Sequence, residues 1–234
     1  MGRKSPQQVI APNHSPLKLI ATMAIDFKKT QLSGHTPEIW RGECKILPGG
    51  FKPVQNFPVG TVLHRGTPIY VDFEAMSAAV CKTAKVLKGG TTTAPRVAKG
   101  HYFVAGDVVM KLGVTDKSPI IKSIDTANAG YDVITFASAI TGLADGDILV
   151  EATEYAETGG GSGSDTITAA PRYTPNMVVG AAKEFTGKGL PTIDAAYEAV
   201  VLYPSLNFPL LEDWLINPGK VCLKANPNIL FIKQ

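Results

Sequence analysis

The sequence predicts a mainly β protein. We expect a β-barrel or sandwich body, an extended N-terminal arm before it, and after it a small β-rich C-terminal module with one short helix. Apolar and polar residues alternate over short stretches, which is the period of strands. The 23 glycines and 17 prolines exceed their usual joint share of about 12% and indicate many turns. With 234 residues, 44% of them hydrophobic, the chain can build a sizeable core.

Residues 1–45 are predicted to form the arm. Four prolines bias their preceding residues toward extended backbone, and apolar residues between them come in small groups, some alternating as in a strand. We expect the arm to lie on a partner surface or to add a strand to one; the alternative is a floppy terminus. The candidate contact residues are Leu17, Leu19, Ile20, Met23, Ile25 and Phe27.

Residues 46–157 are predicted to be the barrel or sandwich domain, because one short pattern recurs in them. Gly60-x5-Gly66-Thr67 aligns with Gly100-x5-Gly106-Asp107, and a weaker copy ends at Gly146-Asp147. We interpret each copy as a strand, a Gly-led turn and a second strand. Glycine supplies the positive φ of such turns, and the following Thr or Asp can hydrogen-bond the turn backbone.

On this interpretation His101 and Tyr102 are strand residues, and a catalytic role for His101 is disfavoured. A hairpin with the longer loop "DTANAG" completes the domain. Residues 158–170 are predicted to be a Gly/Ser-rich linker or loop. Residues 171–234 form the C-terminal module, with strands in "YTPNMVVGAAKEF" and "AAYEAVVLYPSL". Its short helix is predicted to begin at Pro209, and the final "NILFIK" is expected to dock into a sheet.

Composition and motifs disfavour several classes of function. A net charge of +3 without a basic run gives no sign of a nucleic-acid partner, and no segment approaches the roughly 18 apolar residues of a membrane span. The three cysteines form no C-x-x-C pair, so we expect free thiols in a protein made in a reducing cytosol. No phosphate-binding loop or G-x-S-x-G motif is present. We predict no catalytic, cofactor-binding or metal-binding residues, and we expect that the protein is not an enzyme.

Two rival interpretations have named residues. A glycosidase needs a carboxylate pair, for which Glu212–Asp213 and Asp145–Asp147 are candidates, although solvated surface charge explains each pair better. A nucleic-acid-binding barrel needs basic and aromatic side chains on one face. The near match for that is Arg96, Lys99, His101 and Tyr102.

Several segments together resemble a known family. These are "VGTVLHRGTPIYVD", "AKVLKGGTTTAPRVAKGHYFVAGDVV", "SIDTANAGYDVITF", "YTPNMVVG" and "NPNILFIKQ", spread over roughly 55–234. They resemble head fibre proteins of tailed bacteriophages, especially those infecting Bacteroides. The resemblance implies a structural virion protein, made in the host cytoplasm and attached to the outer face of the capsid. It implies binding to the major capsid protein and a homo-oligomer, with a trimer favoured.

One departure from fibre proteins is visible. Fibres that project far from the shell carry a coiled-coil or repetitive shaft, and this chain has no sustained heptad. We therefore expect a compact, decoration-like head fibre, whose outer loops could meet a host surface or mucus glycan. The alternative function is a phage-associated polysaccharide hydrolase or carbohydrate-binding module.

Overall fold

The computed structural model describes residues 38–47, 50–112, 119–153, 169–188, 191–206, 208–216, 219 and 221–233. These residues belong to one compact unit that begins at Pro37. The six arm candidates, Leu17, Leu19, Ile20, Met23, Ile25 and Phe27, lie outside the described residues.

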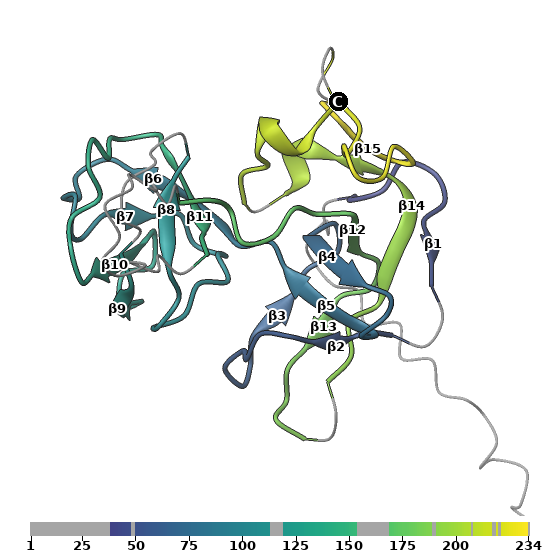
Figure 1. Cartoon of the computed structure of the whole chain (residues 1–234), viewed down its shortest axis with the longest axis horizontal. Coiled ribbons are helices and arrows are strands. Elements are labelled where there is room, and N and C mark those ends of the chain that lie inside the picture. Colours follow the sequence, from purple (N-terminus) through teal and green to yellow (C-terminus); the bar gives the residue numbers. More distant parts are fainter. Residues whose placement is uncertain are drawn as a thin grey trace, which may run out of the picture. The chain divides into compact units, whose positions relative to one another are not determined.

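The predicted β architecture is confirmed. The described residues contain fifteen strands and two 3-10 turns, and no α-helix. The strands belong to a seven-stranded sheet, a six-stranded sheet and a two-stranded sheet (Figure 1). Short strands separated by glycine turns are what the alternating sequence pattern favours.

The seven-stranded sheet has the order β1-β14-β12-β4-β5-β2, and β15 also pairs with β14. Its strands are antiparallel except for the pairs β14–β15 and β2–β5. Their bounds are β1 Lys45–Ile46, β2 Lys52–Pro53, β4 Pro68–Asp72, β5 Ser77–Val80, β12 Met177–Val179, β14 Ala195–Leu202 and β15 Ile229–Ile232. A two-stranded sheet is formed by β3 (Val62–Leu63) and β13 (Lys183–Glu184).

The six-stranded sheet curls around its own small core. Its order is β8-β11-β6-β7-β10-β9, and a bridge between Val108 and Ile120 joins the segments beside its two edge strands. A cluster of ten buried residues, including Val86, Ile134 and Leu149, fills its interior. The bounds are β6 Thr83–Leu87, β7 Arg96–Val97, β8 Val109–Lys111, β9 Ile121–Asp125, β10 Asp132–Phe136 and β11 Ile148–Glu151. The predicted hairpin is the antiparallel pair β9–β10.

Strands from the two sides of the predicted linker pair with each other. β12 pairs with β4, and β13 pairs with β3, so strands of the range 171–234 complete sheets begun in the range 46–157. The final strand, β15, docks in parallel on β14, as expected. The predicted linker lies mostly outside the described residues.

The last residues of the predicted arm add a strand to this chain's own sheet. Trp40 forms a bridge with Val201, and β1 continues along β14 with Lys45 opposite Glu198. The Leu47 N–H then donates to the Ala195 carbonyl at 2.9 Å. The segment 38–47 therefore runs antiparallel along the length of β14.

The helix predicted from Pro209 is a single 3-10 turn, Glu212–Trp214. It stops because the backbone that follows is used for sheet-like pairing. Leu215 bridges to Leu223, and the Lys224 N–H donates to the Trp214 carbonyl at 2.8 Å. Trp214 is buried by this arrangement.

The three Gly-led turns are confirmed. Gly66, Gly106 and Gly146 all have positive φ, at 77°, 94° and 90°. In each turn the residue after the glycine bonds the backbone three residues back. The Thr67 hydroxyl donates to the His64 carbonyl at 2.7 Å, Asp107 Oδ2 accepts from Val104 N–H at 2.8 Å, and Asp147 Oδ2 accepts from Ala144 N–H at 2.7 Å.

Candidate functional site

A lysine buried among carboxylates is the most distinctive polar feature of the described residues. Lys82 lies between β5 and β6, where the chain passes from the seven-stranded to the six-stranded sheet. It is only 1% exposed and is the bulkiest of the fully buried side chains. A lysine is almost never buried unless it is paired, so its partners define the site. We call Gln55, Lys82, Asp107, Glu151 and Arg172 the Lys82 cluster.

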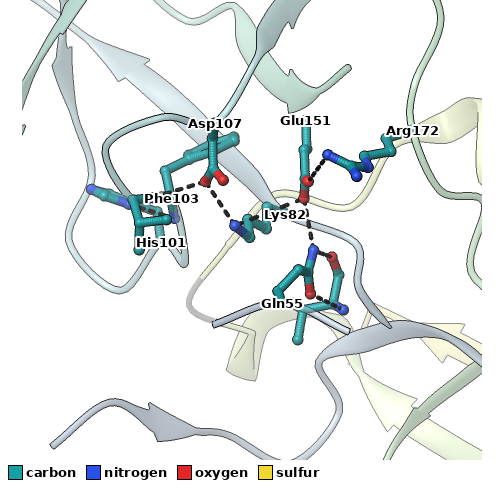
Figure 2. Close-up of polar contacts among 9 residues, drawn as sticks. Gln55, Lys82, His101, Phe103, Asp107, Glu151 and Arg172 are labelled. Atoms are coloured by element: carbon teal, nitrogen blue, oxygen red, sulfur yellow. Dashed lines mark hydrogen bonds and ion pairs between the residues drawn. The ribbon is translucent and has the colours of Figure 1, made fainter. Parts of the chain in front are cut away.

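Lys82 contacts two carboxylates, one from the turn before β8 and one at the end of β11 (Figure 2). Its Nζ lies 2.7 Å from Asp107 Oδ2 and 3.9 Å from Glu151 Oε2. The ring centroid of Phe57 is 5.7 Å from the same nitrogen, a distance typical of a cation–π contact. Asp107 belongs to the second Gly-led turn, and Glu151 ends β11.

Glu151 is held by polar groups on its other sides. Its side chain is 3% exposed. Gln55 Nε2 donates to Oε2 at 2.8 Å, and Arg172 Nη1 lies 3.5 Å from Oε1. Burial raises the pKa of Glu151 above its usual value, and this effect exceeds the opposing attraction of Lys82. The carboxyl group therefore takes up a proton more readily than an exposed glutamate does.

Gln55 fixes the cluster to the sheet. Its Oε1 accepts from the Val80 N–H at 2.7 Å, while its Nε2 donates to the Val80 carbonyl at 2.9 Å. The amide thereby replaces a neighbouring strand at the end of β5 and presents its nitrogen to Glu151. An asparagine could not span the same distance, because its side chain is one methylene shorter.

The sequence analysis missed the Lys82 cluster. A signal was present, since Lys82 follows the small, apolar run from Ala78 to Cys81. Its partners, however, come from positions 25 to 90 residues away along the chain, and no local motif connects them. Sequence reasoning did identify Asp107, as a turn residue, and the structure confirms that role.

The placement of His101 and Tyr102 in a strand is wrong. Both lie in the irregular segment between β7 and β8. Gly100, with φ of 88°, has a left-handed backbone conformation that a strand does not use, and the next strand begins only at Val109. Tyr102 packs into one hydrophobic cluster and Phe103 into the other.

Both ring nitrogens of His101 face groups of this chain. Nδ1 accepts from the Phe103 N–H at 3.2 Å, and Nε2 lies 3.2 Å from Asp132 Oδ2 without the alignment of a good hydrogen bond. Burial lowers the pKa of His101 below 6.5, although Asp132 opposes the shift. A buried imidazole whose Nδ1 accepts a backbone N–H is suited to packing.

The basic residues proposed for nucleic-acid contact are engaged within the chain. Arg96 stacks on the Tyr131 ring, with its guanidinium carbon 4.5 Å from the ring centroid. Lys99 contacts Asp132 and donates to the Thr126 carbonyl at 3.0 Å. With His101 and Tyr102 buried, these four residues do not form a shared exposed face.

The two candidate carboxylate pairs lie in different settings. Glu212 and Asp213 are exposed on the 3-10 turn. Asp145 is exposed in the third Gly-led turn, whereas Asp147 accepts the turn N–H and contacts Lys111 at 2.8 Å. Asp147 is thus occupied as a turn residue.

A groove opens beside the Lys82 cluster. Its volume is about 680 Å³, and its walls come from the β2 region and from the residues around β13. Gln55 is shared between the groove and the cluster, and the rings of Phe57 and Phe185 pack with centroids 4.9 Å apart at its side. Val59, Met76 and the lysines Lys52, Lys183 and Lys188 also line it.

Within the described ranges, no three His, Cys, Asp or Glu side chains gather closely enough to hold a metal ion. The cysteines there are free, and Cys81 is buried in a hydrophobic cluster, as expected for isolated thiols. In the same part of the chain, no helix has the length and apolar character needed to cross a bilayer. Comparison with known proteins finds no matching family, no matching curated protein and no matching solved structure.

Proposed function

We propose that this chain is a structural virion protein, a compact head fibre or decoration protein bound to the outer face of a phage capsid. Its partners are the major capsid protein and further copies of itself, with a trimer favoured. The proposal rests on the sequence resemblance over roughly 55–234 together with one structural observation. That observation is the seating of residues 38–47 along β14, which shows that the last residues of the predicted arm can add a strand to a sheet.

An exposed apolar surface supports a binding role. Val54, Val59, Phe73 and Met76 are between 51% and 73% exposed. Val54 follows β2, Val59 lies in the turn before β3, and Phe73 and Met76 lie in the turn between β4 and β5. Large apolar side chains that gather on a surface are typical of sites that contact another protein. We assign this surface to contact with the capsid or with a second copy, and the arm to anchorage.

Co-sedimentation with capsids that lack this protein tests the proposal. The full chain is compared with a deletion of residues 1–36, which keeps Trp40 and β1 in place on β14. We expect the full chain to pellet with capsids and the deletion to stay in the supernatant. A triple variant, Leu19→Ser, Ile25→Ser and Phe27→Ser, should behave like the deletion. The matched control, Gln7→Ser with Gln8→Ser, should pellet like the full chain.

The remaining outcomes are also informative. If the deletion pellets as well as the full chain, the capsid role stands and the exposed apolar surface carries the contact. If neither chain pellets, the virion proposal fails.

A carbohydrate-binding module is the second candidate, because the groove is of a suitable size. Its volume of about 680 Å³ falls within the range of about 300–1,000 Å³ typical of small-molecule sites. Phe57 supplies an aromatic wall, and Asn56 and Lys52 supply polar groups. Titration with capsule oligosaccharides should then give saturable binding that Phe57→Ala abolishes. Release of reducing sugar in the same samples would instead indicate a polysaccharide hydrolase.

A further inference from the structure

We propose that Lys82 and Asp107 condense spontaneously to an intramolecular isopeptide bond, with Glu151 as the proton shuttle. The product is an amide between Lys82 Nζ and Asp107 Cγ, and one water molecule is released. The inference rests on the geometry of the Lys82 cluster and does not depend on the proposed function.

The reacting groups are already in contact. Lys82 Nζ and Asp107 Oδ2 are 2.7 Å apart, and the two side chains are 1% and 12% exposed. Holding two reactants in contact removes the entropic cost of an encounter, because the reaction no longer waits for the two groups to meet. Asp107 is further positioned by the bond from Val104 N–H, so its carboxyl group does not swing freely.

Burial protects the reacting groups from water. An ammonium and a carboxylate do not condense in water, because the ammonium nitrogen has no free lone pair and the carboxylate resists attack. Around Lys82 and Asp107 the side chains are 1% and 12% exposed, so water has little access to the reacting carbon or to the amide that forms. The Phe57 ring beside Nζ adds to this apolar setting.

The step balances without an oxidant or a cofactor. The ammonium of Lys82 gives one proton to the Asp107 carboxylate, which yields a neutral amine and a neutral acid. The amine lone pair attacks Cγ and forms the C–N bond. Glu151, 3.9 Å from Nζ, accepts the second proton from nitrogen and returns it to the departing hydroxyl. The C–O bond breaks and water leaves, so that Glu151 ends in the state in which it began.

Glu151 is suited to this role by its surroundings. It is 3% exposed, and Gln55 orients its Oε2. Burial raises its pKa, so its carboxyl group takes up a proton more readily than that of a surface glutamate. A proton shuttle must exchange its proton in both directions within one cycle.

The chain contains a matched pair that lacks these conditions. Asp147 occupies the same turn position as Asp107, and Lys111 Nζ lies 2.8 Å from its Oδ2. That pair is 21% and 24% exposed, and the other partner of Lys111 is the Gly142 carbonyl, not a second carboxylate. The N–O distances of the two pairs, 2.7 Å and 2.8 Å, are therefore nearly equal, while burial and the neighbouring glutamate differ. We expect no bond between Lys111 and Asp147.

Intact-mass spectrometry of the denatured, purified protein tests the proposal. We expect a mass below that of the sequence by one water molecule. Tryptic digestion should give a branched peptide that joins the segments containing Lys82 and Asp107, with no cleavage after Lys82. Glu151→Gln and Lys82→Arg should restore the full mass. Lys111→Arg and Asp147→Asn should keep the loss of water.

The proposal is overturned if the unaltered chain keeps its full mass. The mass is measured on freshly purified protein and again after prolonged incubation of the folded protein at neutral pH. This measurement needs no variant, so it decides the matter even if a variant fails to fold. A branched peptide at Lys111 instead of Lys82 would also overturn it. Circular dichroism shows whether Glu151→Gln is folded. A folded Glu151→Gln with the full mass has lost the reaction and not the fold, which supports the proposal. If that variant is unfolded, the unaltered chain alone decides.

Discussion

Thr67, Asp107 and Asp147 hold the same place in three turns, yet each reaches a different long-range partner. The Thr67 hydroxyl lies 3.3 Å from the Tyr102 hydroxyl, Asp107 contacts Lys82, and Asp147 contacts Lys111. The local turn is thus specified by a short pattern, while the contact beyond it depends on what the fold brings near. This explains why the sequence predicts the turns and their backbone bonds but not the Lys82 cluster.

The glycines of these turns should differ in their tolerance of alanine. Gly106→Ala has open space for the new Cβ, so its cost is the left-handed backbone alone, about 1–2 kcal/mol of the free energy of unfolding. Gly66→Ala meets Leu206, Ile39 and Val201 at 3.1–3.3 Å and should cost more. Urea unfolding of both variants measures which one loses more free energy of unfolding. Equal costs would contradict the crowding at Gly66.

His101 should make stability depend on pH. Because its pKa is lowered in the folded state, the unfolded chain binds more protons once the pH falls below 6.5. The stability that the neutral imidazole contributes is therefore present above pH 6.5. It is lost as the pH falls toward the lower pKa of the folded state. His101→Gln should flatten the rise of the free energy of unfolding between about pH 5 and pH 7.

The control for this prediction is His64→Gln, because His64 is exposed. It removes one histidine and leaves the contacts of His101 in place. A pH dependence for His101→Gln that matches that of the unaltered chain would contradict the assignment.

At the scale of elements, β14 organises the seven-stranded sheet. It pairs with β1, β12 and β15, and the last of these lies parallel to it, with Ala199 opposite Ile229 and Leu202 opposite Ile232. The alternation of apolar residues identifies β14 and β15 as strands, because side-chain period is a local property. Their pairing, and the passage of strands across the predicted linker, depend on packing between distant segments, which the pattern does not encode. The same limit applies at Trp214, where pairing with residues 222–224 replaces a longer helix.

The two faces of β15 should respond differently to truncation. Ile229 is fully buried, whereas Leu230 is half-buried on the opposite face. Ile229→Ala should lower the free energy of unfolding by about 2–5 kcal/mol, the usual cost of a large cavity in a core. Leu230→Ala should cost clearly less. Chemical denaturation of both variants checks the register, and a reversed order would contradict it.

At the scale of the whole described unit, the two larger sheets share a core. One hydrophobic cluster includes Tyr102, Met110 and Val150 together with residues of the seven-stranded sheet. Polar contacts add to this. The His64 N–H donates to the Tyr102 hydroxyl at 3.0 Å, and the Thr83 hydroxyl donates to the Pro209 carbonyl at 2.7 Å. We therefore expect the two sheets to unfold together.

Tryptophan fluorescence provides the test, because both tryptophans, Trp40 and Trp214, lie outside the six-stranded sheet. Ile134→Ala opens a cavity in the small core of that sheet, where Ile134 is fully buried. We expect the fluorescence transition to shift to lower denaturant along with the circular dichroism signal. A fluorescence midpoint that stays in place while the dichroism curve splits in two would show independent unfolding.

The seating of residues 38–47 along β14 also has a mechanical consequence. These residues run antiparallel to β14 and are joined to it at Trp40, Lys45 and Leu47. Tension that enters upstream of Glu38 and is directed along β14 would load these bonds simultaneously, in shear. Tension directed across the sheet would instead peel them apart one after another, at a lower force. The same short run of hydrogen bonds therefore resists a high force when it is pulled along β14 and a low force when it is pulled across the sheet.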